Sequence, residues 1–366
     1  MALKTYLKNQ FLFGFSVILF LSACKKEVDV QPNEEGLSPK IALRSDLLMA
    51  SKSSVAEITS NSSILKLGIN GHLGDAPYLK VPWAKQIAMI KERGMSYYRI
   101  NVQTKADGSA SSSVHLNALQ KAADAAGVKI LPMLYLRTLD YNKSEAENYK
   151  MGKDLGGRFA AKYGKYFVFY NLGNDEELPL IYKNKTGMKP EHYDPVKFKA
   201  AAAYLKGMDE GIKANDPDAK TLVGAGWLHF GFLQMCVDYG IKFDRIAYNW
   251  YSDMENAAPK APYFITDITQ TLTSLFPDKP IWFTEYNYRY KATSLTNEID
   301  QDEFVNRFTA KCRANPNVKV AMVYELFDEP YKSVQESSYG IIKWKTHYDI
   351  WEDKLLSKTF LSNLFK

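Results

Sequence analysis

The chain has 366 residues, of which 46% are hydrophobic and 24% are charged, and its formal net charge is +6. That charge is mild for the length and no long basic stripe occurs, so nucleic acid is not an expected partner. Apart from Cys24, the cysteines are Cys236 and Cys312, both in helix-like segments and far apart. This pattern favours two buried thiols over a disulfide framework or a metal site.

The first residues have the layout of a secretory signal. Lys4 and Lys8 precede an apolar stretch over 11–21, and small residues follow it before Cys24. A membrane-spanning helix needs roughly 20 apolar residues, so this stretch is too short to cross a bilayer comfortably. The run Leu-Ser-Ala-Cys resembles the bacterial lipobox, in which the cysteine is acylated and becomes the new N-terminus. An ordinary signal peptide that happens to contain a cysteine is the alternative.

We therefore expect residues 1–23 to be a lipoprotein signal peptide, with Cys24 as the lipidation site and membrane anchor. The expected location is the bacterial cell envelope, lipid-anchored in the outer membrane and facing the periplasm or the surface. Residues 24–63 are rich in Glu, Ser, Asn and Lys, without convincing periodicity after Leu48. Such a composition predicts a flexible tether, although a short helix over 41–50 is an alternative for part of it.

From Ile64 to the C-terminus, short apolar strands alternate with helical stretches. Each strand candidate has the length and the β-branched or aromatic content of a buried parallel strand. The expected strands are 64–70, 96–102, 128–135, 166–172, 221–225, 245–249, 280–285 and 318–324. The helical patterns cover 83–93, 116–126, 145–163, 195–214, 232–239, 262–275, 301–314 and 350–365. Gly94 and Gly127 follow helices, and we expect them to end those helices in a left-handed turn.

Eight strands and eight helices in about 300 residues predict a single α/β domain, a (β/α)8 TIM barrel over 64–366. A doubly wound open sheet is the competing fold. It needs fewer units and usually a glycine-rich phosphate loop, and neither GxGxxG nor a Walker motif occurs in the sequence. In a barrel, chemistry takes place at the carboxyl ends of the strands and in the loops after them. Residues at those positions are Asn70, His72, Arg99, Asn101, Tyr135, Arg137, Asn174, Asp175, Trp227, His229, Asn249, Tyr251, Glu285, Tyr324 and Glu325.

Two acidic sites stand out at that edge of the barrel. Glu285 ends the seventh strand within PIWFTEYN, and the acidic run 175–177 follows the fourth strand. Retaining glycoside hydrolysis uses a carboxylate nucleophile and a carboxylic acid about 5–5.5 Å apart. A buried carboxylate also needs hydrogen-bond donors around it, and we expect Arg99 and Tyr251 to donate to Glu285.

Nearly all of the chain after the tether resembles clan A of the retaining glycoside hydrolases. The resemblance implies an Asn-Glu acid/base after strand four, a Glu nucleophile after strand seven and a β-linked glycan as substrate. FTEYN matches the strand-seven pattern, with Glu285 as the nucleophile. Arg99 matches the strand-two arginine and Tyr251 the strand-six tyrosine, while Asn249 stands where many members carry His. The segment 337–344, which ends at Trp344, resembles the late loop of several such enzymes.

The departure from the family pattern is at strand four. Gly-Asn-Glu is replaced by Gly-Asn-Asp-Glu-Glu, so Asp175 stands in the acid/base position. Its carboxyl is about 1.5 Å shorter in reach, and a shift of about 1 Å can cost on the order of a hundredfold in rate. We expect Asp175 to act as the acid/base and Asn174 to keep the sugar-binding amide. The alternatives are that Glu176 swings in, or that the step is lost.

Simpler readings exist for each part. An acidic helix cap is the alternative for the run 175–177 taken alone, and an ion pair with Arg99 is the alternative for Glu285. Trp227 and Trp344 are candidate platforms for sugar rings, and His72 is a candidate hydrogen-bonding residue on the rim. No HxxxH or close Cys/His cluster occurs, so neither a metal nor another cofactor is expected.

Three functions therefore remain open. The leading hypothesis is a monomeric, membrane-anchored retaining glycoside hydrolase that acts on a β-linked oligo- or polysaccharide. The second is a non-catalytic carbohydrate-binding lipoprotein with a degenerate site, and its main support is the Asn-Asp sequence. The third is a barrel with unrelated chemistry, because one fold hosts many reactions.

Overall fold

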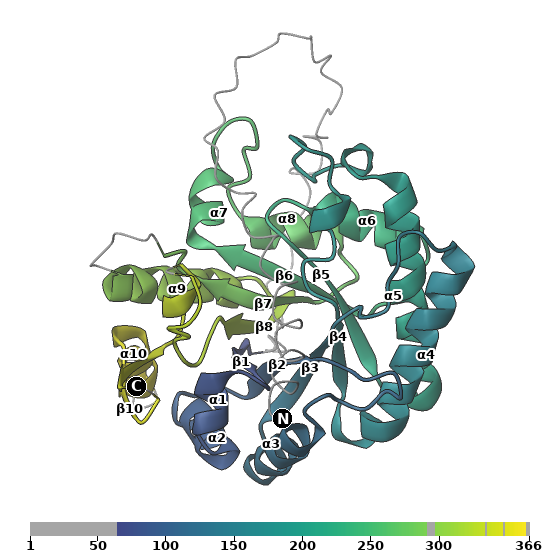
Figure 1. Ribbon diagram of the computed structural model, residues 1–366. Coiled ribbons are helices and arrows are strands. Elements are labelled where there is room, and N and C mark those ends of the chain that lie inside the picture. The colour runs from purple at the N-terminus through teal and green to yellow at the C-terminus, as the bar shows by residue number, and fades with distance from the viewer. Residues whose placement is uncertain (1–63, 291–296, 334, 347, 364–366) are drawn as a thin grey trace, which may run out of the picture. The chain divides into compact units, whose positions relative to one another are not determined.

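The computed structural model describes residues 64–290, 297–333, 335–346 and 348–363. The expected signal peptide, the tether and Cys24 lie outside these ranges. Among the described residues, eight parallel strands close into a barrel with helices around it (Figure 1). The strands are β1 Lys66–His72, β2 Tyr97–Val102, β3 Lys129–Leu134, β4 Phe169–Leu172, β5 Lys220–Gly226, β6 Arg245–Tyr251, β7 Ile281–Asn287 and β8 Val318–Val323. They pair in chain order and β8 closes on β1, which confirms the predicted (β/α)8 barrel.

The helices of the outer layer follow the predicted pattern closely. They are α1 Ala76–Lys80, α2 Trp83–Glu92, α3 Ser113–Ala126, α4 Glu145–Tyr163, α5 Pro195–Asn215, α6 Phe230–Asp238, α7 Ser252–Ala257, α8 Ile268–Leu275, α9 Asn297–Ala314 and α10 Leu355–Asn363. Single 3-10 turns cover Gly164–Tyr166, Leu178–Leu180, Pro190–His192 and Glu336–Ser338. Gly94 and Gly127 have φ values of 71° and 68°, as expected for residues that end helices. Within the described ranges, every helix is too short or too polar to traverse a bilayer.

Two predicted helices begin later than expected. α8 begins at Ile268 because the Asp267 side chain accepts hydrogen bonds from the Thr269 and Gln270 amides and caps the helix there. The helix predicted over 350–365 is wrong at its start, since Ile350–Asp353 forms a strand, β10.

β10 pairs antiparallel with β9, Ile342–Thr346. Trp351 lies opposite Trp344, with their ring centroids 5.9 Å apart. Aromatic cross-strand pairs stabilise a two-stranded ribbon, and this one overrides the helical pattern. The segment 337–344, which resembles a late loop of the glycoside hydrolases, therefore contains the end of a 3-10 turn and the start of the first strand of this hairpin.

The interior of the barrel has an apolar layer beneath a polar one. The apolar layer is a separate buried cluster drawn from strands β2 to β8, with Tyr97, Leu131, Leu222, Ala247, Trp282, Val320 and Met322, and with Phe169 packed against it. Because side chains alternate along a strand, the inward residue after Tyr97 is Arg99. Asn70, Asn171, Asn249 and Glu285 lie at the same level and are all buried. The apolar layer thus supports a set of polar groups at the carboxyl ends of the strands.

The two buried thiols are present as predicted, since Cys236 and Cys312 are both buried and free. Helices α4 and α5 pack backbone against backbone through glycines. A Cβ added to Gly152 or Gly207 would lie 2.1 Å from the Tyr204 carbonyl oxygen or 2.0 Å from the Tyr149 carbonyl oxygen. Only glycine fits at such a close approach.

Candidate active site

Glu285 is placed by an irregularity in β7. Tyr248 pairs with Phe283, but the next residue, Asn249, pairs with Glu285, so Thr284 is an extra residue in the strand. A bulge of this kind changes the direction of the side chains that follow it. Thr284 donates to the Asn249 side chain at 3.1 Å, and Glu285 also lies inside the barrel, so two consecutive side chains enter the site.

Both oxygens of Glu285 accept hydrogen bonds from the donors that the sequence predicts. Oε1 accepts from Arg99 Nη1 at 2.7 Å, and Oε2 accepts from the Tyr251 hydroxyl at 3.0 Å. Burial, and then the charge of Glu285, raise the pKa of Tyr251 well above its usual range. Tyr251 therefore keeps its proton and remains a donor. The Glu285 side chain is only 10% exposed and is held rigidly.

Arg99 is the centre of the network. Besides Glu285, its guanidinium donates to the side-chain oxygens of Asn70 and Asn171, each at 2.8 Å, and to Asn174 at 2.7 Å. One planar group thus joins β1, β4 and β7, with the loop after β4 also attached. A guanidinium suits this task because its donors lie in a fixed fork.

Asp175 lies on the other side of Asn174 from Arg99. Its Oδ1 accepts from Asn249 Nδ2 at 3.0 Å and its Oδ2 from Asn174 Nδ2 at 2.9 Å. Its backbone is left-handed, with φ of 55°. Burial, followed by the charges of Glu177 and Glu285, raises the pKa of Asp175 to about 8. These surroundings favour the protonated form of the carboxyl at neutral pH.

The three acidic side chains that follow β4 have different hydrogen-bond partners. Asp175 joins the Arg99 network, whereas Glu176 Oε1 accepts from the Asn174 backbone amide at 3.3 Å. Glu177 is fully buried and accepts from the Gly226 amide at the end of β5. The cap alternative does not describe these carboxyls, because the following 3-10 turn has no side-chain cap hydrogen bond. Burial raises the pKa of Glu176 to about 7.

His72 lies on the rim as predicted, but its partners are the acids after β8. Its Nε2 is 2.7 Å from Glu325 Oε2, and the Tyr78 hydroxyl donates to the same oxygen at 2.9 Å. Burial lowers the pKa of His72 and outweighs the opposing charge of Glu329. The predicted role of His72 in binding substrate stays a prediction.

One group among the described residues has ligand atoms close enough for a metal ion. His72, Glu325 and Glu329 each offer one such atom, and these atoms lie within 4.8 Å of one another. The Lys332 ammonium, however, forms an ion pair with Glu329. Burial raises the pKa of both Glu325 and Glu329 to about 8, so a proton and the ammonium compensate the cluster. Sequence reasoning missed Glu329 and Lys332, which lie in the loop after β8.

The two tryptophans singled out from the sequence lie in different places. Trp227 follows β5 with φ of 49° and stacks on Trp250, with ring centroids 6.1 Å apart. Trp344 lies in the C-terminal hairpin, where its Nε1 donates to the Asp328 carbonyl at 3.0 Å. Neither is bonded to Glu285, and only Trp227 follows a barrel strand directly.

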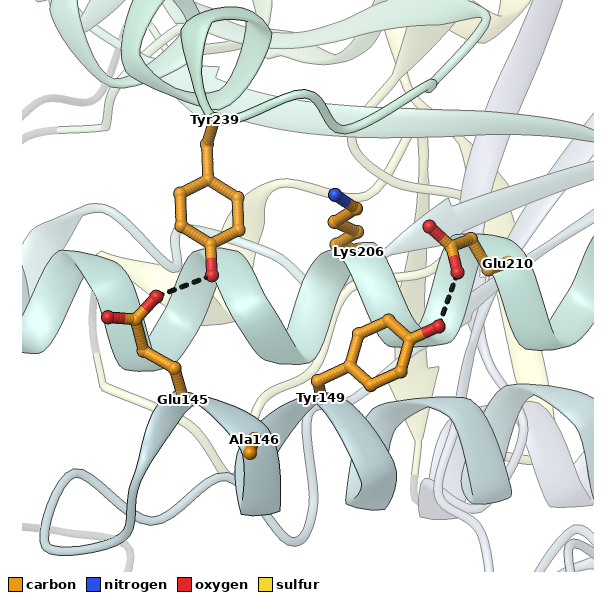
Figure 2. A pocket seen from close by; sticks show the side chains of 6 residues that line it. All are labelled: Glu145, Ala146, Tyr149, Lys206, Glu210 and Tyr239. Carbon is orange, nitrogen blue, oxygen red and sulfur yellow. Dashed lines mark hydrogen bonds between the residues drawn. The ribbon is translucent and has the colours of Figure 1, made fainter.

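Two of the hollows formed by the described residues bear on the position of the site. One of them has a volume of about 380 Å³ and lies over α4 and α5 (Figure 2). There, Tyr239 donates to Glu145 at 2.7 Å and Tyr149 donates to Glu210. It lies on the outer helices and contains none of the residues of the Arg99 network, so it belongs to a different part of the molecule. The other, of about 500 Å³, is lined by Ser252 and Arg289 among others.

This second hollow adjoins the site. The Arg289 guanidinium carbon lies 4.1 Å from the centre of the Tyr251 ring, and Tyr251 binds Glu285. On its other side, Tyr263 packs edge-on against Trp227, with centroids 5.2 Å apart. Two lining residues of the hollow thus contact Tyr251 and Trp227, while Glu285 and Asp175 are not part of its lining.

Known proteins place these features in context. Residues 90–339 match a family model described as the glycosyl hydrolase catalytic core. A family 39 glycoside hydrolase from the gut symbiont Bacteroides cellulosilyticus WH2 has a similar structure, with 16% identity and a TM-score of 0.60. That match covers 82% of this chain and 63% of the length of that enzyme. The chain's sequence matches no curated protein.

Two further solved structures are similar. The β-glycosidase BGL167 has 12% identity and a TM-score of 0.61, and the match covers 83% of this chain and 96% of that one. A β-glucosidase from Thermotoga maritima has 10% identity and a TM-score of 0.59, with 83% and 98% covered. At such low identities, the similarity to these structures shows a shared fold and nothing more.

Proposed function

Because the chain belongs to the glycosyl hydrolase catalytic core family, we propose that it hydrolyses a β-linked glycan with retention of configuration. Glu285 is the nucleophile and Asp175 the acid/base. One observation carries this proposal: Arg99 donates to Glu285 at 2.7 Å and to Asn174 at 2.7 Å, and Asn174 in turn donates to Asp175. A single rigid group therefore relates the two carboxyls to each other.

The proposed reaction has two steps. In the first, a Glu285 oxygen attacks the anomeric carbon, the bond from that carbon to the leaving oxygen breaks, and Asp175 gives its proton to that oxygen. In the second, the Asp175 carboxylate takes a proton from water, whose oxygen attacks the anomeric carbon and releases Glu285. Asp175 ends as it began, protonated.

The surroundings of Asp175 determine where its shorter side chain lies. The left-handed backbone at Asp175 redirects the side chain, and Asn249 and Asn174 each donate to one of its oxygens. These two amides hold the carboxyl in one orientation.

A glycan needs room on either side of the scissile bond. The proposed place for a saccharide unit next to the scissile bond is the hollow lined by the aromatic rings of Tyr263 and Tyr288 and by polar groups of Ser252 and Arg289. Aromatic faces and hydrogen-bonding groups together suit a saccharide unit. The proposed substrate is accordingly an oligo- or polysaccharide.

The first test is Glu285→Gln, assayed on a panel of aryl β-glycosides and β-linked oligosaccharides. Loss of the nucleophile lowers kcat by a factor on the order of a thousand or more, while oligosaccharide binding persists. Glu303→Gln, an exposed position on α9, is the matched control and keeps full activity. Normal turnover by Glu285→Gln rejects the mechanism. Retention is checked by NMR of the first-formed anomer.

The alternative of a non-catalytic carbohydrate-binding protein has the Asn-Asp sequence in its favour. An activated fluorosugar separates the two, because a good leaving group needs little help from an acid. Covalent labelling of Glu285 with turnover of natural glycans supports the enzyme. Affinity for glycans without labelling or turnover supports the binding protein.

We also propose that Cys24 carries a lipid that anchors the protein in the bacterial cell envelope. The supporting observation is the Leu-Ser-Ala-Cys run behind an apolar stretch. Metabolic labelling with an alkyne fatty acid is expected to mark the native chain and to leave Cys24→Ser unmarked. Equal labelling of both rejects this site of anchoring.

A further inference from the structure

Glu177 lies two residues after Asp175, yet its side chain is fully buried on the β5 side of the loop. Its Oε1 accepts from the Gly226 amide at 2.9 Å and lies 3.0 Å from His229 Nδ1. Gly226 is the last residue of β5, and His229 precedes α6. A buried carboxyl with these partners joins the loop after β4 to the loop after β5.

The two loops joined by Glu177 both contain a left-handed residue that is not glycine. Asp175 has φ of 55° and Trp227 has φ of 49°. Such conformations persist only where the surrounding contacts determine them. The Trp227 carbonyl accepts from the Tyr248 hydroxyl at 2.5 Å, so β6 holds one loop and Glu177 connects it to the other.

Glu177 also contributes its charge beside Asp175. The charged groups that face Asp175 are Glu177, Glu285 and the Arg99 guanidinium, of which the two acids raise the pKa of Asp175 and Arg99 lowers it. After burial, Glu177 is the largest cause of the raised pKa. The Glu176 carboxyl accepts from the Asn174 backbone amide.

We propose that Glu177 is a positioning residue for the glycosidic reaction, which fixes the loop that presents Asp175 and keeps that side chain in its proton-donating form. This inference rests on the proposed function. Glu177 touches neither Glu285 nor the space beside it in any contact among the described residues, so its effect passes through Asp175. Sequence reasoning assigned it only to the possible acidic cap.

The test compares Glu177→Gln with Glu303→Gln, which removes an exposed carboxyl on α9, outside the Arg99 network. The glutamine oxygen still accepts from the Gly226 amide, so the charge is lost while the loop contact is kept. Removing a neighbouring negative charge makes ionisation of Asp175 easier. The alkaline limb of the kcat/KM profile, on an aryl glycoside with a poor leaving group, is expected to move to lower pH by on the order of one unit. In Glu303→Gln the limb stays in place.

A second variant protects the test against simple misfolding. Glu177→Asp keeps the negative charge at a shorter reach, and the alkaline limb is expected to return most of the way to its native position. Equal alkaline limbs in the native chain and Glu177→Gln, with activity reduced in proportion to stability, overturn the proposal. So does a shift of the same size in Glu303→Gln.

A direct titration separates failure of this inference from failure of the proposed function. The Asp175 carboxyl carbon is followed by NMR over pH in the free protein, in the native chain and in Glu177→Gln. A lower midpoint in the variant supports the inference even if no glycan is hydrolysed, in which case the proposed function alone falls. An unchanged midpoint overturns the inference, whatever the activity.

Discussion

Arg99 binds Glu285 and Asn174 through different nitrogens of one guanidinium, Nη1 and Nη2, each at 2.7 Å. The third nitrogen, Nε, donates to Asn171 at 2.8 Å. The plane of the group is therefore held by contacts to β4, to β7 and to the loop after β4. A rotation of this plane would displace the β4 loop and the β7 carboxylate together. The separation of the proposed acid and nucleophile is therefore tied to the orientation of Arg99.

Arg99→Lys tests this relationship. A lysine keeps the charge but lacks the fork, so it can satisfy only part of the four acceptors that Arg99 serves. We expect kcat/KM to fall by roughly a hundredfold, which corresponds to a misplacement of about 1 Å. The matched control is Arg93→Lys, a buried arginine bonded to Ser357 and to the Met89 carbonyl. It is expected to lower stability and leave kcat/KM nearly unchanged, and equal losses of kcat/KM in both variants contradict the assignment.

The raised pKa of Asp175 predicts how both the activity and the stability of the protein depend on pH. Because the acid must be protonated, kcat/KM is expected to fall as pH rises through about 8. For stability, the folded pKa lies above that of the unfolded chain, so the folded protein binds more protons between the two values. The free energy of unfolding therefore falls as pH rises from about 4 to about 8.

Asp175→Asn removes this dependence without changing the size of the side chain. At pH 8 the variant is expected to be more stable than the native protein by about 1–3 kcal/mol, and near pH 4 the difference disappears. Urea unfolding at the two pH values measures it. A variant that is less stable than the native chain at pH 8 contradicts the assignment of the raised pKa.

Asp175→Ala tests the acid/base role itself. Hydrolysis of natural glycans is expected to fall by about a hundredfold to ten-thousandfold, the usual contribution of general acid–base catalysis. Hydrolysis of glycosides with highly activated leaving groups is expected to fall much less in its first step. Added azide needs no general base, so it is expected to restore turnover and give a glycosyl azide of the same configuration as the substrate. Unchanged activity on natural glycans assigns the acid to another residue.

The cluster of His72, Glu325 and Glu329 yields a prediction about metals. Because the Lys332 ammonium already pairs with Glu329, a chelator is expected to change neither the melting temperature nor the activity. Lys332→Met leaves the buried acids without their cation, and we expect a loss of about 3 kcal/mol in unfolding free energy at pH 8. At pH 5 both acids are protonated and the loss shrinks. Stabilisation of the native chain by added Zn²⁺ or Mn²⁺ contradicts this description.

Much of the site could be predicted from strand parity and from short patterns. Arg99 follows Tyr97 at the spacing that directs both side chains inward, and the donors to Glu285 could be named because a buried carboxylate requires them. The barrel could be predicted because each strand is a short apolar run between helical patterns.

What could not be predicted depends on backbone irregularities. The extra residue Thr284 in β7 turns two consecutive side chains inward, which no alternating pattern reveals. The left-handed backbone at Asp175 and the burial of Glu177 separate three adjacent acids that look alike in the sequence. Such features arise from contacts between loops that are far apart in the chain, and local propensity carries no signal for them.

Trp344 was expected to contact substrate, and its observed contacts predict a structural role. Its indole nitrogen donates to the Asp328 carbonyl, and its ring packs edge-on against Trp351. Trp344→Ala is expected to lower the free energy of unfolding by about 2 kcal/mol, less than for a fully buried tryptophan because the side chain is half-buried. KM is expected to stay within about twofold of the native value, since no energy of substrate binding is lost. A several-fold rise in KM at native stability would instead support the platform predicted from the sequence.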